Sequence, residues 1–424
     1  MDGSATGNAY LSQLFLHWFA KGGDLMYDLP NNALVNYIFP NNEEVWWSLM
    51  IVIYPYLTGL IAGAFVVSAL YHVMNLKQFK PIANFALVAA YCFGLFAAMP
   101  LLIHLGQPQR AFEIYFTPHL TSAMSIFGYI YTGYLVLLTL EIWLIYRKHF
   151  IQKANDTTGI QRSIWYLLTL GVTTYHPDSA NLDRKIARIL AGIGIPWAVL
   201  LHGYVGFVFG SVKAISWWAT ALQPIIFLSS AVVSGIAILI LMYTFIHWRH
   251  RVSPDYSMIK KLAVILWAAF LFDWGLEMLE VVHVWYQDSH EWSVIQPLIL
   301  GPIYDSYVWG QIIWLSAVPV FLLGYAVLYG GNGKSMFIMV NIGSFMLLSQ
   351  VLFMRFNVVI GGQLISKSAR GFVDFHWDIF GKEGLLTAAI LFAAPFVTYY
   401  VISRFIPVFE FDEPSLEPKS HGQQ

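Results

Sequence analysis

Long apolar stretches alternate with short polar segments along the chain. A transmembrane helix needs roughly 20 predominantly apolar residues to cross the hydrocarbon core of a bilayer. Nine stretches meet this requirement, at residues 45–74, 81–105, 122–146, 189–212, 224–248, 262–286, 307–329, 335–358 and 385–406. Many of them end in Trp or Tyr, which gather where the bilayer meets water. The pattern therefore predicts an all-α, polytopic transmembrane bundle of about nine spanning helices.

Two terminal segments lie outside these stretches. Residues 1–44 contain an apolar segment at 10–19 that is too short to span a bilayer, and it predicts a helix lying in the membrane interface. The same region lacks a basic stretch and a small-residue cleavage site, so no signal peptide is expected. Residues 407–424 are acidic and contain proline, which is typical of a disordered tail. The predicted organisation is an extracytoplasmic segment at 1–44, a bundle at 45–406 and a tail at 407–424.

The basic residues predict how the bundle is oriented. If the nine stretches alternate in direction, 16 of the 23 Lys and Arg residues fall on one side of the membrane and seven on the other. The cytoplasmic side of a membrane protein carries the excess of Lys and Arg. We therefore expect an extracytoplasmic N-terminus and a cytoplasmic C-terminus.

Composition supports the membrane assignment and narrows the chemistry. Hydrophobic residues make up 58% of the chain and charged residues 11%, against about 25% charged residues in a typical soluble domain. The net charge of −1 argues against a nucleic-acid partner, which requires a clustered basic face. The single cysteine, Cys92, cannot form a disulfide within the chain or ligate an iron–sulfur cluster by itself. We therefore expect no metal site in this chain.

Four ionisable residues lie within the sixth apolar stretch. Asp273, Glu277, Glu280 and His283 are spaced by four, three and three residues, so they share one face of a helix. A charged group inside a bilayer costs several kcal/mol, and this face is therefore expected to look into the bundle. At 1.5 Å per residue, Asp273 lies about 17 Å from the cytoplasmic end of its helix, near the midplane, and the other three lie in the outer leaflet.

Further polar residues are expected at a similar depth on other helices. His202 lies about 20 Å along the fourth apolar stretch, in its outer half. His104 is in the last turn of the second stretch, and Ser125 is in the first turn of the third. Each also has a structural interpretation: His104 could cap its helix, and Asp273 or Glu277 could pair with Arg355 on the eighth stretch. A shared depth is what a site within the membrane requires.

Five short motifs resemble the polysulfide-reductase membrane-subunit family, which includes the NrfD-like and PsrC-like proteins. In chain order they are Tyr54-Pro-Tyr-Leu-Thr-Gly, His104-Leu-Gly-Gln-Pro, Ser122-Ala-Met-Ser-Ile-Phe-Gly, Leu201-His-Gly-Tyr and Trp217-Trp-Ala-Thr-Ala-Leu-Gln-Pro. The resemblance extends over about residues 46–406. It implies a quinone-binding membrane anchor of a respiratory complex in the cytoplasmic (inner) membrane of a prokaryote. Its quinone site would lie near the outer surface, formed largely by the first helices.

The same resemblance implies partner subunits. Members of this family sit beside a ferredoxin-like subunit that carries iron–sulfur clusters, and beside a separate catalytic subunit. For this chain the catalytic partner would be a molybdenum enzyme, a hydrogenase or a multihaem cytochrome. The bound cofactor would be menaquinone or ubiquinone, and the chain would move electrons between the quinone pool and the iron–sulfur partner.

We expect His104 and His202 to flank the quinone head group, because histidine both donates hydrogen bonds and exchanges protons near neutral pH. Asp273 and Glu277 are expected to relay protons, since a desolvated carboxylate can bind a proton. Three further residues complete the predicted site: Tyr204 and Ser125 as secondary donors, and Arg110 at the outer mouth.

Three other interpretations stay open. A b-type cytochrome anchor would use His104 and His202 as axial ligands of a haem. An ion or solute transporter would use the carboxylates of the sixth stretch as an ion path. A structural anchor would hold its partners without binding a quinone.

Overall fold

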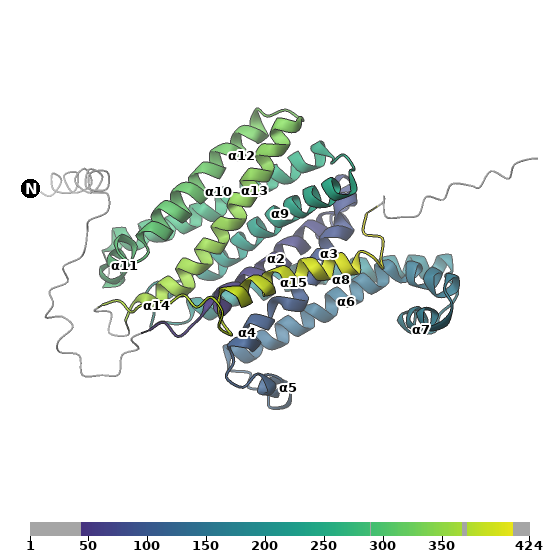
Figure 1. The fold of residues 1–424 in the computed structure, drawn as a ribbon, viewed down its shortest axis with the longest axis horizontal. Coiled ribbons are helices and arrows are strands. Elements are labelled where there is room, and N and C mark those ends of the chain that lie inside the picture. The colour runs from purple at the N-terminus through teal and green to yellow at the C-terminus, as the bar shows by residue number, and fades with distance from the viewer. Residues whose placement is uncertain (1–43, 289, 367–370, 410–424) are drawn as a thin grey trace, which may run out of the picture.

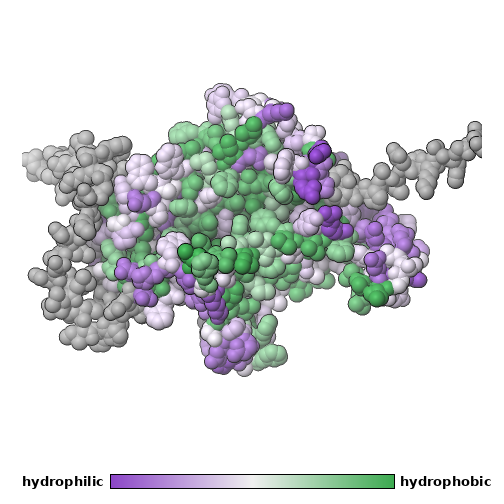
Figure 2. Space-filling view, viewed as in Figure 1, coloured by the Kyte–Doolittle hydropathy of each residue, from purple (hydrophilic) through white to green (hydrophobic). Residues whose placement is uncertain are grey.

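The computed structural model describes residues 44–288, 290–366 and 371–409. Over these residues the chain is an elongated helical bundle whose long helices run side by side (Figure 1). Nine helices of the described ranges are long and apolar enough to cross a membrane, which confirms the predicted all-α bundle. Apolar side chains cover the middle of the bundle and polar ones gather toward its two ends (Figure 2).

Each of the nine spans overlaps one of the predicted stretches, and three of the spans are composed of more than one element. They are α2 (Leu49–His72), α3 and α4 (Lys80–Ala97 and Met99–His104), α6 (Ala123–Asp156), α8 (Pro177–Gly210), α9 (Gln223–His250), α10 (Tyr256–Gln287), η4 and α12 (Tyr304–Ala317 and Val318–Leu328), α13 with η5 and α14 (Lys334–Phe356, Asn357–Gly361 and Gly362–Leu364), and α15 (Leu385–Ile402). The connecting segments contain η2 (Lys77–Phe79), η3 (Pro108–Arg110), α5 (Glu113–Phe116), α7 (Gly159–Leu168) and α11 (His290–Leu300).

Helix α2 lies at the centre of the bundle. It packs against α3, α8, α9 and α13, and 94% of its most apolar window is buried inside the protein. Gly63 of α2 faces Gly235 of α9 so closely that a Cβ added at Gly63 would lie 2.2 Å from the carbonyl oxygen of Ala231. Small residues permit this approach of two helix backbones within a membrane.

Helices α6 and α8 extend well beyond their predicted apolar stretches. Each has 34 residues, or about 51 Å at 1.5 Å per residue, whereas the hydrocarbon core is about 30 Å thick. Their polar extensions are joined by an ion pair of 2.9 Å between Arg147 and Asp183. The amphipathic α7 folds back on α6, where Trp165 stacks on Phe150. This pair of helices and α7 project past the other spans (Figure 1).

We call the end at which α2 begins the Leu49 end, and the opposite one the His72 end. The charge pattern predicts that the Leu49 end is extracytoplasmic. The predicted interfacial helix at 10–19 and the acidic tail from residue 410 onward lie outside the described residues. Val408 and Phe409, the last described residues, belong to the predicted disordered tail but are buried against the bundle at the His72 end, where Phe409 stacks on Phe85 at 5.2 Å.

Candidate functional site

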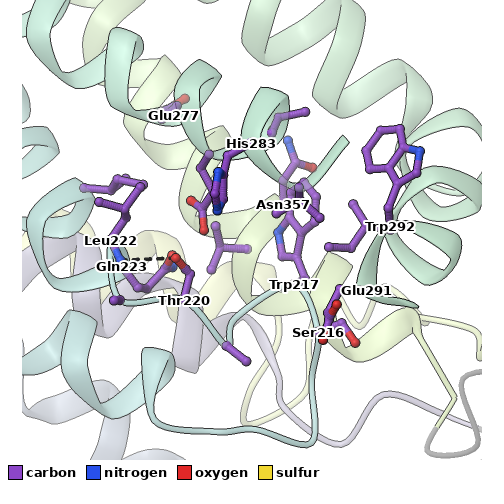
Figure 3. A pocket seen from close by; sticks show the side chains of 18 of the residues that line it. Ser216, Trp217, Thr220, Leu222, Gln223, Glu277, His283, Glu291, Trp292 and Asn357 are labelled. Carbon is purple, nitrogen blue, oxygen red and sulfur yellow. Dashed lines mark hydrogen bonds between the residues drawn. The ribbon is translucent and has the colours of Figure 1, made fainter. Parts of the chain in front are cut away.

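A cavity of about 490 Å³ opens at the Leu49 end. Its walls come from the α8–α9 connection, the start of α9, the last turns of α10, and parts of α11, η4 and η5 (Figure 3). Trp217 and Trp292 supply aromatic surface, and Ile226 and Ile295 supply aliphatic surface. Ligand sites in proteins commonly have about 300–1,000 Å³ and mostly apolar walls with a few polar groups.

One face of α10 lines this cavity with side chains that range from buried to exposed. Glu277, Glu280 and His283 all line it, and they become more exposed toward the mouth. Glu277 is 7% exposed, Glu280 is partly buried and His283 is exposed. Asp273 lies one turn deeper, behind the lining, and is fully buried. The spacing of these residues thus produces a row of titratable groups from the interior to the surface.

Glu277 is held by amide side chains from two other spans. Gln311 donates from Nε2 to Oε2 of Glu277 at 3.0 Å, and Gln350 donates from Nε2 to Oε1 at 3.3 Å. Asn357 donates to Oε1 of Gln311 at 2.9 Å, and its own Oδ1 accepts from Ser306 at 2.7 Å. The carboxyl group therefore sits at one end of a connected amide network that fixes its position.

Two π-helical segments bring these amides to the cavity. Gln311 belongs to η4, and Asn357 begins η5. A π-helix inserts an extra residue into each turn, which turns side chains away from their α-helical directions, and such segments often occur at functional sites. Both residues line the cavity.

Two N–H donors at the cavity lack an acceptor. Nε1 of Trp217 and Nε2 of Gln223 are buried and have no hydrogen-bond partner within the described part of the chain. Both side chains line the cavity. A buried donor without an acceptor costs about 1–3 kcal/mol, so a ligand that offers acceptor oxygens would be stabilised here.

Arg355 lies fully buried behind the cavity, at the end of α13. It donates from one terminal nitrogen to Oγ of Ser230 at 2.7 Å and to the carbonyl oxygen of Phe227 at 3.2 Å. Its guanidinium carbon lies 3.7 Å from the ring centroid of Phe227, a cation–π contact. Across residues 44–409, apart from the undescribed positions, no carboxylate approaches Arg355 within the 4.0 Å of an ion pair.

His202 contacts the same arginine. Its Nε2 lies 3.1 Å from Arg355, and because arginine has no acceptor, Nε2 must be the unprotonated nitrogen. His202 is therefore neutral, with its hydrogen on Nδ1, which is buried and has no partner among the described groups. Asp273 is held separately, by a 2.5 Å hydrogen bond that Oγ of Ser229 donates. His202 and Asp273 thus lie in the interior, beyond the lining of the cavity.

The other predicted site residues lie away from this cavity. His104 donates from Nδ1 to Glu383 at 2.6 Å, and Ser48 donates to the same carboxylate oxygen at 2.5 Å. Both side chains of the His104–Glu383 pair are about a quarter exposed, at 26% and 29%. The hydroxyl of Ser125 is buried, with no partner in the described ranges. His104 ends α4, Ser125 lies in the first turn of α6, and Glu383 lies in the segment that precedes α15.

Tyr204 and Arg110 are peripheral. Tyr204 is partly buried and packs against Phe207 with ring centroids 5.3 Å apart. Arg110 is exposed and donates to Glu113 at 2.7 Å. This hydrogen bond lowers the pKa of the Glu113 carboxyl below its usual range. Neither side chain lines the cavity.

Comparison with known proteins places this chain among membrane subunits of reductase complexes. A family model described as polysulphide reductase, NrfD, matches residues 39–367. A selenate reductase subunit from Mesobacillus selenatarsenatis is 33% identical over 303 residues, which cover 68% of this chain and 70% of that protein. The Hdr-like menaquinol oxidoreductase integral membrane subunit from Archaeoglobus fulgidus is 26% identical over 53% of this chain and 48% of its own length. A polysulfide reductase polypeptide from Wolinella succinogenes is 21% identical over 76% and 95%.

Proposed function

The chain belongs to the NrfD family of polysulphide reductase membrane subunits, and from this premise we propose that it is the quinone-binding subunit of a membrane oxidoreductase complex. It would exchange electrons between the quinone pool and an iron–sulfur partner subunit. A separate subunit would carry the terminal catalytic centre. The names of two relatives, a selenate reductase subunit and a menaquinol oxidoreductase subunit, support this class of complex.

The cavity at the Leu49 end is the observation that carries this proposal. A quinone presents a flat ring with two carbonyl oxygens, both hydrogen-bond acceptors. The cavity offers aromatic walls, the unpaired donors of Trp217 and Gln223, and the carboxyl group of Glu277. When bound, a quinone supplies a redox couple of two electrons and two protons. The donors would hold the carbonyl oxygens, and Glu277 would exchange a proton at the ring.

The row of groups on α10 would connect this proton to the surface. In the direction of quinol oxidation, the Glu277 carboxylate would take a proton from a hydroxyl group. Glu280 and the exposed His283 continue along the same wall to the mouth. Histidine can release a proton to water near neutral pH. Asp273, with one oxygen bound to Ser229 and the other without a partner in the described structure, can hold a proton one turn deeper.

A second location for the head group uses the residues expected from sequence. His104, fixed by Glu383 and partly exposed at the same end, could donate to a quinone oxygen from the first helices. The buried hydroxyl of Ser125 would be a further donor, with Tyr204 and Arg110 at the periphery. His202 would act from the interior through its contact with Arg355 rather than by touching the ring.

The test is the quinone content of the complex purified in mild detergent. Val281 lines the cavity, whereas its neighbour Val282 is 52% exposed and lies outside it. Val281→Trp should fill the cavity and remove the bound quinone, and Val282→Trp should retain it. Mass spectrometry would identify the partner subunits, and an absorption spectrum would reveal any haem.

The outcomes separate the alternatives. Loss of quinone in His104→Gln but not in Val281→Trp would move the site to the first helices. A purified protein with neither quinone nor an iron–sulfur partner would refute the proposal and favour an ion or solute transporter. A haem spectrum that disappears with His104 or His202 would favour a cytochrome anchor.

A further inference from the structure

A second hollow lies at the opposite, His72 end of the bundle. It has a volume of about 830 Å³ and is formed by the end of α9, the loop into α10 and the first turn of α13. Arg249 and Arg251 line it, together with Thr244, Trp248 and Phe337. Because α9 ends at His250 and α10 begins at Tyr256, this hollow lies where two spans leave the apolar region.

The two arginines are available to an anion. Both side chains are exposed, and neither guanidinium group has a hydrogen bond or an ion pair with any described residue. Asp255, the acidic residue of the connecting loop, instead caps α10: its Oδ1 accepts from the backbone N–H groups of Ser257 at 2.9 Å and Met258 at 3.1 Å. Arginine binds phosphate oxygens with a planar fork of donors.

A polar group deeper in the hollow lacks a partner. The hydroxyl of Thr244 is buried and makes no hydrogen bond with the described residues, although the side chain lines the hollow. The adjoining surface is aromatic and open. Trp248 is 72% exposed and Phe245 is 60% exposed, with ring centroids 5.8 Å apart. Trp gathers at the interface between head groups and acyl chains.

We propose that this hollow binds the phosphate of an anionic phospholipid. Arg249 and Arg251 hold the phosphate oxygens, and Thr244 donates to the head group. Trp248 and Phe245 lie against the start of the acyl chains. This apolar surface favours a lipid over free phosphate, since inorganic phosphate would gain nothing from it. The site is independent of the quinone proposal, because it lies at the other end of the bundle.

The experiment uses the delipidated full-length complex in mild detergent. Native mass spectrometry measures the binding of dioctanoyl phosphatidylglycerol, dioctanoyl phosphatidylcholine and inorganic phosphate. Each arginine beside an anionic lipid contributes about five-fold in affinity, so Arg249→Gln with Arg251→Gln should weaken phosphatidylglycerol binding about 25-fold. The control is Lys185→Gln with Arg188→Gln, which removes the same charge from exposed positions of α8 at the same end and should leave binding unchanged.

Three results would overturn the proposal. The first is equal binding of phosphatidylcholine and phosphatidylglycerol, and the second is an equal loss in the control pair. The third is displacement of the lipid by inorganic phosphate at equal concentration, which would indicate a free-phosphate site. If the arginine pair fails to assemble, Thr244→Val keeps the shape of the side chain and should weaken phosphatidylglycerol binding by about five-fold, the value of one hydrogen bond. Unchanged binding in that variant would also refute the site.

Discussion

Replacement of Glu277 by glutamine tests the proposed proton chemistry most directly. The amide has almost the same shape as the carboxyl group but cannot take a proton from a quinol. A positioned general base contributes about 10²- to 10⁴-fold to a rate. Glu280 lies three residues further along the same wall and can partly substitute, so we expect the lower limit, a loss of about 100-fold in turnover. This corresponds to about 2.7 kcal/mol in the barrier.

The structural effect of Glu277→Gln should be small. Glu277 accepts hydrogen bonds from Gln311 and Gln350, and a glutamine retains one acceptor oxygen. The new amide N–H would face Gln350, whose Oε1 has no partner among the described residues and can rotate toward it, while Oε1 of Gln311 stays bonded to Asn357. The net cost is one rearranged hydrogen bond, about 1 kcal/mol. The variant complex should therefore assemble with the same set of subunits as the wild type.

The assay is steady-state oxidation of a short-chain quinol, or reduction of the quinone, by the purified complex. Glu141→Gln is a matched control, because Glu141 is also a buried carboxylate in a spanning helix, is 1% exposed, and lies outside the cavity. It should retain turnover. The reasoning is refuted if Glu277→Gln stays within about two-fold of wild type while the quinone remains bound, or if both variants slow equally.

Three further predictions concern stability, each measured by thermal unfolding of the purified complex. Arg355→Lys keeps the charge but loses the fork of donors and the stacking on its aromatic neighbour, so we expect a loss of about 2–3 kcal/mol; an unchanged midpoint would contradict the role of this geometry. Gly63→Ala forces two backbones apart and should cost about 1–3 kcal/mol, whereas Gly203→Ala, where a Cβ meets nothing within 4 Å, should cost less; equal effects would argue against the close contact. Asp183→Asn removes the partner of Arg147 and should cost about 1–3 kcal/mol. Adding Arg147→Gln removes the unpaired charge and should recover part of this stability, so an absence of recovery in the double variant would contradict the prediction.

The length of the apolar stretches was sufficient to predict the spans but not the full length of the helices. The third stretch was expected to end at residue 146, whereas α6 continues to Asp156. Hydropathy marks where a helix leaves the bilayer, and the polar residues beyond that point stay helical because α6 and α8 support each other. The ion pair between Arg147 and Asp183 is one such contact, and no hydropathy window could reveal it.

The candidate site could be predicted only in part from the sequence. Acidic residues in an apolar stretch are rare enough to draw attention to Glu277, and its helical spacing correctly grouped it with Glu280 and His283 along one wall. Gln311 and Gln350 carry no charge, and they lie 34 and 73 residues from Glu277. Only the packing of three spans and the π-helical turn of η4 bring them together. The expected emphasis on the first helices also differs from the position of the cavity, which lies mainly among α9, α10, η4 and η5.

The enclosure of α2 has a consequence for how this protein is made. Helix α2 is synthesised before the eight described spans that follow it, yet it touches lipid along very little of its length in the finished bundle. During membrane insertion α2 must therefore stay unpacked in the bilayer, or beside the insertion machinery, until α3, α8 and α9 are inserted and pack against it. Its contact with α9 through Gly63 and Gly235 forms only after more than 150 further residues have been translated. A substitution at that contact would therefore have its first effect during biogenesis. It would leave α2 unpacked and open to degradation before any effect on electron transfer.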